Sequence, residues 1–169
     1  MKDSLPIRKH PRLKGYDYSQ NGAYFITICV KDRHKMLGRI VGRDAPGAPC
    51  YVELSEYGQV IYKEIEDTPL YYENITVEKF VVMPNHIHMI VLINGNGGAP
   101  RASRPTSAWI PKMIGIIKRK TNKANGFNMW QTSYHDHIIR DEEEYLRIWK
   151  YIDENPIRWN EDEFNTEVP

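Results

Sequence analysis

The sequence predicts an α+β fold: a largely antiparallel central sheet, of the ferredoxin-like or RRM-like kind, covered by helices. Short runs rich in aromatic and β-branched residues, typical of strands, are interleaved with three helical segments. Two of these runs are separated by only a two-residue turn, which predicts an antiparallel hairpin. The chain has 169 residues and no internal repeat, so we expect one domain over residues 1–169, with a basic N-terminal segment over about residues 1–15.

The first half of the chain contains three strand-like runs and one helix. Residues 23–30 (AYFITICV) alternate in polarity and predict a strand, and residues 36–41 (MLGRIV) predict a shorter one. Residues 42–49 are rich in Gly and Pro and predict a loop, after which residues 50–55 (CYVELS) predict a third strand. Ser55 can then cap a helix that runs to about residue 67, with apolar residues at intervals of four: Tyr57, Ile61 and Ile65.

The predicted hairpin lies in the middle of the chain. Residues 75–84 (ITVEKFVVMP) form a strand that ends at Pro84, and residues 86–93 (HIHMIVLI) form the next strand. The Gly-rich residues 94–105 predict a loop.

Two helices are predicted in the remaining chain. The first is basic and spans roughly residues 111–123, with Pro111 in its first turn. Residues 126–138 read as irregular. Asp141 and Glu144 form a capping box at the start of the last helix, which runs to about Glu154 and ends before Pro156.

Composition narrows the classes of protein. No apolar run approaches the ~20 residues of a membrane span, and the first ten residues lack the apolar stretch of a secretory signal. The chain has 2 cysteines, too few for a disulfide framework, so we expect a cytoplasmic protein with Cys29 as a small buried residue.

Positive charge is concentrated in two segments although the formal net charge is only +1. Residues 101–123 contain basic side chains and no acidic one, and residues 2–14 are also basic. Such segments are typical of proteins that bind polyanions, but ordinary solvated surface explains the charge pattern alone equally well.

His86 and His88 lie in the apolar run VVMPNHIHMIVLIN. Alternate residues of a strand point to the same face, so both imidazoles face one way while Ile87 faces the core with Met89 and Val91. Two adjacent imidazoles can bind one metal ion. The alternative is two histidines on a solvent-exposed face.

The last helix carries a second pair of polar groups. Its apolar stripe is formed by Tyr145, Ile148, Trp149 and Ile152, and the four-residue spacing of Tyr151 and Asn155 places these two on the flank of that stripe. A helix laid on the sheet can bring this phenol and amide over the histidines. This would give a metal site of two imidazoles and one amide oxygen beside a phenolic nucleophile, although packing and helix termination also explain the pair.

These motifs together resemble a known family. MPNHIHMIV resembles the His-hydrophobic-His motif of the HUH single-tyrosine transposases. YHDHIIRDEEEYLRIWKYIDENPIRW resembles the C-terminal signature of their REP-associated tyrosine transposase branch, and SAWIPKMIGIIKRKTNK resembles its basic helix. The resemblance implies that Tyr151 is the nucleophile and that Asn155 joins His86 and His88 as a metal ligand. The insertion-sequence branch has glutamine at the position of Asn155.

The resemblance implies an activity and its requirements. Family members nick and rejoin single-stranded DNA through a 5′-phosphotyrosine intermediate, at hairpins of mobile or repeated elements. Imidazole ligands alone suit zinc or other transition metals, whereas the resemblance implies Mg²⁺ or Mn²⁺. His137 and a metal-bound water remain alternative general bases.

Further implications concern binding. The resemblance implies a homodimer, and Trp109 or Trp130 is a candidate for stacking on an unpaired base, although core packing is the commoner role of a tryptophan. Basic side chains are expected to contact the phosphate backbone: Arg8, Lys9, Arg12, Lys14, Lys112, Lys118, Arg119, Lys120 and Lys123.

Two other functions are compatible with the sequence. A catalytically inactive relative would bind single-stranded DNA with the same fold, but Tyr151, His86 and His88 are all present. An unrelated metallohydrolase would use the histidines without a covalent step, and it leaves the basic helix and the Tyr151–Asn155 pair unexplained. A covalent protein–DNA adduct would distinguish the three.

Overall fold

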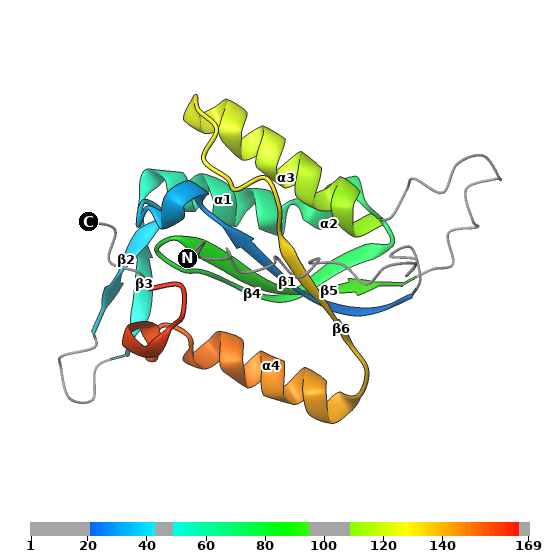
Figure 1. Ribbon diagram of the computed structural model, residues 1–169. Coiled ribbons are helices and arrows are strands. Elements are labelled where there is room, and N and C mark those ends of the chain that lie inside the picture. The colour runs from blue at the N-terminus through cyan, green and yellow to red at the C-terminus, as the bar shows by residue number, and fades with distance from the viewer. Residues whose placement is uncertain (1–20, 43–48, 95–108, 166–169) are drawn as a thin grey trace, which may run out of the picture.

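The computed structural model describes residues 21–42, 49–94 and 109–165. A four-stranded antiparallel sheet lies between two layers of helices (Figure 1). Helices α1, α2 and α3 cover one face and α4 covers the other. The strand order is β4-β5-β1-β6, and the strands are β1 (Gly22–Cys29), β4 (Ile75–Val82), β5 (His86–Ile93) and β6 (His135–Ile139).

The connections define a ferredoxin-like topology. Helix α1 (Glu56–Glu66) connects β1 to β4, β4 and β5 form a hairpin, and α3 (Trp109–Asn125) connects β5 to β6. The two central strands, β1 and β5, pair with each other along their whole length. The predicted α+β fold with a largely antiparallel sheet is therefore confirmed, as is the predicted hairpin.

The remaining elements are short, with the exception of α4 (Glu142–Glu154). Strands β2 (Gly38–Val41) and β3 (Tyr51–Leu54) form a separate antiparallel pair before α1. A short helix, α2 (Thr68–Tyr71), follows α1, and the described residues include the 3-10 turns η1 (Lys31–Arg33) after β1 and η2 (Trp159–Glu161) after α4. None of the helices in the described part of the chain combines the length and apolarity that crossing a membrane requires.

The main core lies between the sheet and the α1/α3 layer. Alternate residues of the two central strands point into it, and their side chains are fully buried. The helices contribute the inward residues of their amphipathic faces. This core includes Tyr24, Ile26 and Ile28 of β1; Ile87, Met89 and Val91 of β5; Ile61 and Ile65 of α1; and Met113, Ile114 and Ile117 of α3.

Helix α1 begins where the sequence predicts. The Ser55 hydroxyl accepts a hydrogen bond from the Gly58 amide (3.2 Å) and donates one to the Met36 carbonyl (2.6 Å). A Cβ at Gly58 would lie 2.0 Å from the Leu37 carbonyl oxygen. A glycine is therefore required for the helix to pack this closely against the backbone that precedes β2.

Helix α4 has a complete N-terminal cap. The Asp141 carboxylate accepts a hydrogen bond from the Glu144 amide (2.8 Å), and the Glu144 carboxylate accepts one from the Arg140 amide (2.9 Å). Ile148 and Ile152 then pack against the opposite face of the sheet from the main core.

Strand β6 corrects one expectation. Residues 126–138 read as irregular from the sequence, yet His135–Ile139 pair with β1 as an edge strand. His and Asp have weak strand preferences, so pairing with β1 decides the conformation of this segment. The basic N-terminal segment falls outside the described residues, as do most of the predicted loops at 42–49 and 94–105.

Candidate active site and metal centre

His86 and His88 lie side by side on β5, on the face of the sheet opposite the main core. Their ring centroids are 4.5 Å apart, and the side chains are 0% and 1% exposed. The alternative of two histidines on a solvent-exposed face is therefore wrong. Aromatic rings from the C-terminal segment cover the pair, because Phe164 contacts both imidazoles and Trp159 stacks on His86.

Asn85 orients His86. The Asn85 side-chain amide donates to the backbone carbonyls of Arg33 (3.1 Å) and Phe164 (2.7 Å), so its oxygen is left to accept. That oxygen lies 2.9 Å from His86 Nδ1. Nδ1 therefore carries the proton, and Nε2 presents a lone pair. Nε2 is buried and has no hydrogen-bond partner among the described residues.

His88 connects β1 to α4. Its Nδ1 lies 2.8 Å from the hydroxyl of Thr27, which stands opposite it on β1. Its Nε2 lies 3.3 Å from the hydroxyl of Tyr151. A hydroxyl partner on Nδ1 fixes the ring plane, as the outer partners of metal-binding histidines do.

Helix α4 brings Tyr151 and Asn155 to the histidines. Tyr151 is 38% exposed, and its ring meets Phe25 of β1 edge to face at 6.1 Å. Asn155, at the C-cap of α4, is 2% exposed, and its side-chain oxygen is buried with no hydrogen-bond partner among the described residues. The structure thus brings His86, His88 and Tyr151 into contact, and Asn155 adjoins them through side-chain hydrogen bonds with Tyr151 and Asp162.

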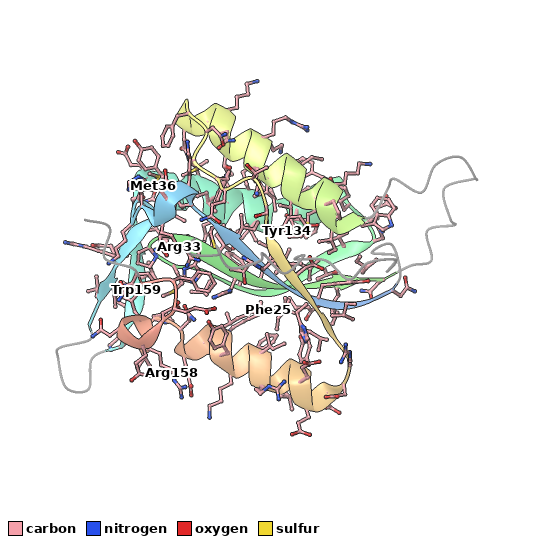
Figure 2. All side chains as sticks on the ribbon, viewed as in Figure 1. Phe25, Arg33, Met36, Tyr134, Arg158 and Trp159 are labelled. Atoms are coloured by element: carbon pink, nitrogen blue, oxygen red, sulfur yellow. The ribbon has the colours of Figure 1, made fainter. Side chains whose placement is uncertain are left out.

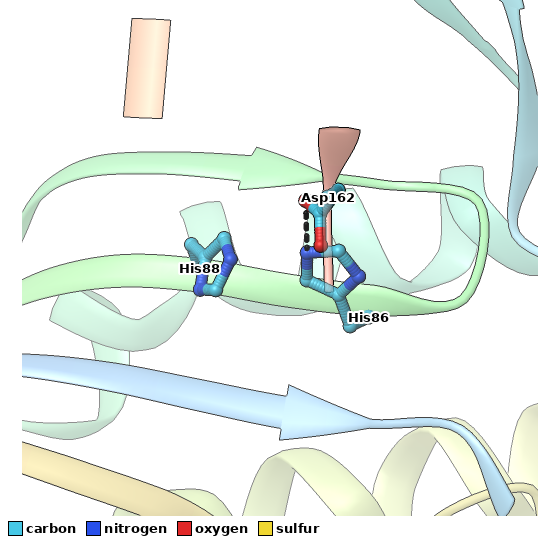
Figure 3. A group of neighbouring side chains, drawn as sticks. All are labelled: His86, His88 and Asp162. Atoms are coloured by element: carbon cyan, nitrogen blue, oxygen red, sulfur yellow. Dashed lines mark ion pairs between the residues drawn. The ribbon is translucent and has the colours of Figure 1, made fainter. Parts of the chain in front are cut away.

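Asp162 is a fifth member that the sequence analysis missed. It follows the turn η2, and one of its carboxylate oxygens lies 3.8 Å from His86 Nε2 (Figure 3). Ligand atoms of His86, His88 and Asp162 all lie within 4.8 Å of one another. No sequence signal distinguishes Asp162 from the acidic residues around it.

Burial controls the protonation of the site. It lowers the pKa of His88 to about 3, and burial, His88 and the Arg33 charge together hold the pKa of His86 well below its ordinary value. Both imidazoles are therefore neutral at pH 7. Burial and the Asp162 charge raise the pKa of Tyr151, and burial likewise raises the pKa of Asp162.

The buried atoms fit a divalent cation. His86 Nε2, Asn155 Oδ1 and Asp162 Oδ2 are all buried without a hydrogen-bond partner among the described residues, which is costly unless a ligand supplies one. Neutral imidazole nitrogens and carboxylate or amide oxygens are common metal ligands. The cluster could therefore hold a metal ion.

A cavity of about 400 Å³ opens beside this cluster. Tyr151 and His88 lie on its wall together with Arg33 and Phe164. His137, a candidate base, also lines it, but its Nε2 lies 2.7 Å from a carboxylate oxygen of Glu144. His137 thus lines the same cavity as Tyr151, but its Nε2 already has a partner in Glu144 of α4.

The predicted DNA-binding side chains divide into two groups. Lys112, Arg119 and Lys123 are exposed on α3. Lys118 instead donates to three backbone carbonyls, those of residues 131–133, at 2.7–3.3 Å, and burial lowers its pKa to about 8. This geometry argues against a phosphate contact by Lys118, because its donors stabilise the segment before β6.

The other candidates are more constrained. Lys120 pairs with Glu64 (3.1 Å) and lies over the ring of Tyr71. The predicted contacts Arg8, Lys9, Arg12 and Lys14 fall outside the described residues. Trp130 is 3% exposed and donates to the Thr121 hydroxyl (2.8 Å), so it packs in the core, and Trp109 packs against Tyr72.

Known proteins resemble this chain in sequence and in fold. No protein-family model matches it. An uncharacterized protein of Haemophilus influenzae is 33% identical over 172 residues, which cover 92% of each chain. Another protein of the same organism, named "Putative REP-associated tyrosine transposase", is 24% identical over 147 residues, covering 84% of this chain and 74% of its own.

The fold has a solved counterpart. The structure of a REP-associated tyrosine transposase bound to a REP hairpin superposes with a TM-score of 0.59 at 21% identity, covering 82% of this chain and 68% of that chain. The fold is thus that of a transposase. Sequence and fold relatives agree with the motifs around His86 and Tyr151: the chain is related to the uncharacterized Haemophilus influenzae protein, and it is similar to REP-associated tyrosine transposases in sequence and in fold.

Proposed function

We propose that the protein is a metal-dependent single-stranded DNA transesterase that nicks and rejoins DNA through a 5′-phosphotyrosine at Tyr151. One observation carries the proposal. The Tyr151 hydroxyl lies 3.3 Å from His88 Nε2, on the wall of an open cavity beside buried ligand atoms that have no hydrogen-bond partner in the described part of the chain. A phenol held against such a cluster, yet open to a substrate, is placed for nucleophilic attack.

The proposed transesterification requires no external energy source. The Tyr151 oxygen forms a bond to phosphorus, and the bond from phosphorus to the 3′-oxygen of the preceding nucleotide breaks. The phenol loses a proton and the departing 3′-oxygen gains one. One phosphodiester replaces another, so the step is reversible, and attack by a 3′-hydroxyl rejoins the strand.

His86, His88, Asn155 and Asp162 would hold the metal ion, which we propose to be Mg²⁺ or Mn²⁺. When bound, the ion stabilises negative charge on the phosphate oxygens and on the leaving group. Without a cation, burial and Asp162 keep the phenol of Tyr151 protonated, because both raise its pKa. The protein's own part is to keep both imidazoles neutral and to fix the rings through Asn85 and Thr27.

The DNA would approach past the β6 edge of the sheet. The exposed basic residues Lys112, Arg119 and Lys123 lie on α3, in the layer opposite the one that carries Tyr151 (Figure 1). A hairpin bound by α3 must therefore pass an edge of the sheet to reach the cavity, and β6 residues such as His137 line that cavity. Arg12 and Lys14 would add further phosphate contacts.

Hairpins of repeated elements are the proposed substrates, and a homodimer acting in the cytoplasm is the proposed form of the enzyme. The substrate proposal is supported by the REP hairpin bound to the structurally similar transposase. The assembly proposal rests on the family resemblance alone.

Covalent trapping tests the function. The protein is incubated with a pool of 3′-labelled hairpin oligonucleotides carrying randomised single-stranded flanks, with Mn²⁺ or with EDTA. We expect a labelled adduct of protein and DNA on a denaturing gel with Mn²⁺ and none with EDTA. DNA binding without any adduct would instead support the inactive DNA-binding alternative, and cleavage without an adduct would support a hydrolase.

A further inference from the structure

Arg33 occupies an unusual backbone position at the edge of the site. It ends the turn η1, and it and Asp32 both have left-handed backbone angles, with φ of 58° and 54°. Residues other than glycine adopt this region infrequently, and such positions cluster at functional sites. The left-handed backbone conformation of Arg33 therefore indicates a functional role for this residue.

The same residue that orients His86 holds this turn in place. The Asn85 amide donates to the Arg33 carbonyl (3.1 Å), and the Arg33 amide donates to the Val30 carbonyl (3.1 Å). Since Asn85 also contacts His86 Nδ1, the arginine backbone and the imidazole are held in fixed relation to each other.

The Arg33 side chain reaches the cavity. Its guanidinium carbon lies 4.3 Å from the centroid of the Phe164 ring, and that ring packs on His86 at 4.6 Å. Arg33 lines the cavity together with Tyr151 and His88. In the structure, Arg33 and Trp159 lie at the same end of the molecule (Figure 2).

One guanidinium nitrogen lacks an acceptor. Arg33 Nη1 is buried and makes no hydrogen bond to any described residue. A guanidinium remains charged at all relevant pH values, and a buried donor without an acceptor is unfavourable. Arginine donors pair best with carboxylate and phosphate oxygens, and a ligand in the cavity can supply such an oxygen.

We propose that Arg33 is a catalytic residue that donates to a nonbridging oxygen of the phosphodiester attacked by Tyr151. This inference rests on the proposed function and adds a charged group to it. As the Tyr151 oxygen approaches phosphorus, negative charge grows on the nonbridging oxygens, and a fixed guanidinium stabilises it. Arg33 transfers no proton and forms no covalent bond.

The test compares two substitutions of Arg33 that we expect to fold as the wild type does. Arg33→Met keeps an apolar stem over Phe164 and removes the charge, whereas Arg33→Lys keeps the charge and loses the planar guanidinium. Arg39→Ala, at an exposed arginine of β2 paired with Glu53, is the control for loss of one positive charge. Thermal unfolding establishes that each variant is folded.

The first measurement is the single-turnover rate of adduct formation with the labelled hairpin pool and Mn²⁺. We expect Arg33→Met to slow this rate about 100-fold or more, which is the usual effect of removing one donor to a developing oxyanion. Arg33→Lys should recover part of the rate, and Arg39→Ala should keep all of it. Adduct formation by Arg33→Met at the wild-type rate would overturn the proposal.

The second measurement requires no chemistry and separates this proposal from the proposed function. Binding of the pool is measured against salt concentration in the Tyr151→Phe background, with and without Arg33→Met. Loss of one phosphate contact should lower the affinity and reduce the salt slope by about 0.7. If the wild-type protein formed no adduct but Arg33→Met still reduced the salt slope, the proposed nicking activity would be refuted and the phosphate contact of Arg33 would be supported. If Arg33→Met left the salt slope unchanged, the phosphate contact would be refuted.

Discussion

The two faces of the central sheet differ sharply in composition. On the α1/α3 face, Ile87, Met89 and Val91 of β5 enter a large apolar core. On the α4 face, the alternate residues of the same strand are His86, His88 and Ile90, and the apolar cluster there is small, comprising Ile90, Ile139, Ile148 and Ile152. The α1/α3 face therefore supplies most of the hydrophobic stabilisation, while the α4 face contains many buried polar groups.

This division explains how two imidazoles can be buried together. Burial of uncompensated polar groups destabilises a protein, so the α4 face needs partners for them, and Asn85, Thr27 and Tyr151 provide part of that set. Two of the buried atoms left without a hydrogen-bond partner among the described residues, His86 Nε2 and Asp162 Oδ2, lie 3.8 Å apart beside His88. Changes on the two faces should therefore affect different properties.

The largest effect is expected on the apolar face. Ile87→Asp places a carboxylate at a position that is 0% exposed, within the main core. We expect loss of the fold, or destabilisation of more than about 4 kcal/mol, measured by urea unfolding. The control is Leu146→Asp on α4, where the side chain is 58% exposed and the expected change is within about 0.5 kcal/mol. Equal stability of the two variants would contradict the assignment of the core face.

The next substitution should abolish catalytic activity and change the stability of the fold only slightly. Tyr151→Phe removes only the hydroxyl, so the adduct should vanish while the protein stays folded and still binds the hairpin pool. Tyr145→Phe is the matched control, because Tyr145 packs against Trp149 on the inward stripe of the same helix. Mass spectrometry should map the wild-type adduct to Tyr151; an adduct that persists in Tyr151→Phe would refute the assignment.

A third change should act on metal affinity. Asp162→Asn keeps the size of the side chain and removes its charge, so we expect Mn²⁺ affinity to fall about tenfold or more. Because Trp159 stacks on His86 at 6.0 Å, tryptophan fluorescence can follow the titration. Glu161→Gln, one residue earlier and exposed, should bind Mn²⁺ as the wild type does. Equal affinities in all three proteins would exclude Asp162 as a ligand.

The sequence revealed the apolar face more completely than the polar one. Strands and helices with a clear apolar period were predicted within a few residues, including β5 and α4, because burial on one face leaves a periodic signal. Strand β6 was missed because its first residues, His135, Asp136 and His137, have weak strand preferences, and only pairing with β1 forms it.

The candidate site was predictable only where a motif spans neighbouring positions. His86 with His88, and Tyr151 with Asn155, have strand and helix spacings that place each pair on one face. Asp162 has no such partner: it reaches His86 because the chain turns back after α4, and that path depends on tertiary packing of Trp159 and Phe164. The three-carbonyl contact of Lys118 is equally invisible in the sequence.

A fourth prediction concerns the stability of the protein at low pH. The pKa of His88 is about 3 in the folded protein, against ~6.5 in the unfolded chain, and the pKa of His86 is lowered in the same direction. Between these pH values the unfolded chain binds protons that the folded protein does not. In EDTA, the free energy of unfolding should therefore fall as pH decreases below ~6.5, by up to about 1.4 kcal/mol per pH unit for each histidine.

The raised pKa of Asp162 opposes this trend in part, since the folded protein binds a proton there first. Urea unfolding at several pH values measures the slope. His88→Gln should reduce it, whereas a substitution at the exposed His135, His135→Gln, should leave it unchanged. A flat profile in the wild type would mean that the imidazoles are not buried in solution.

The smallest expected effect distinguishes two adjacent basic residues of α3. Arg119 is exposed, so Arg119→Ala should leave stability nearly unchanged and reduce the salt slope of single-stranded DNA binding by about 0.7, the loss of one phosphate contact. Lys118 is held by three backbone carbonyls, so Lys118→Ala should instead destabilise the fold by about 1–3 kcal/mol, because buried acceptors lose a charged donor. The salt slope of DNA binding by Lys118→Ala should stay at the wild-type value.

Filter binding between low and moderate salt measures the salt slope, and urea unfolding measures the stability. If Lys118→Ala changed the slope and Arg119→Ala did not, the DNA would have to run along the carbonyl-facing side of α3, next to the segment before β6, and the path proposed here would be wrong.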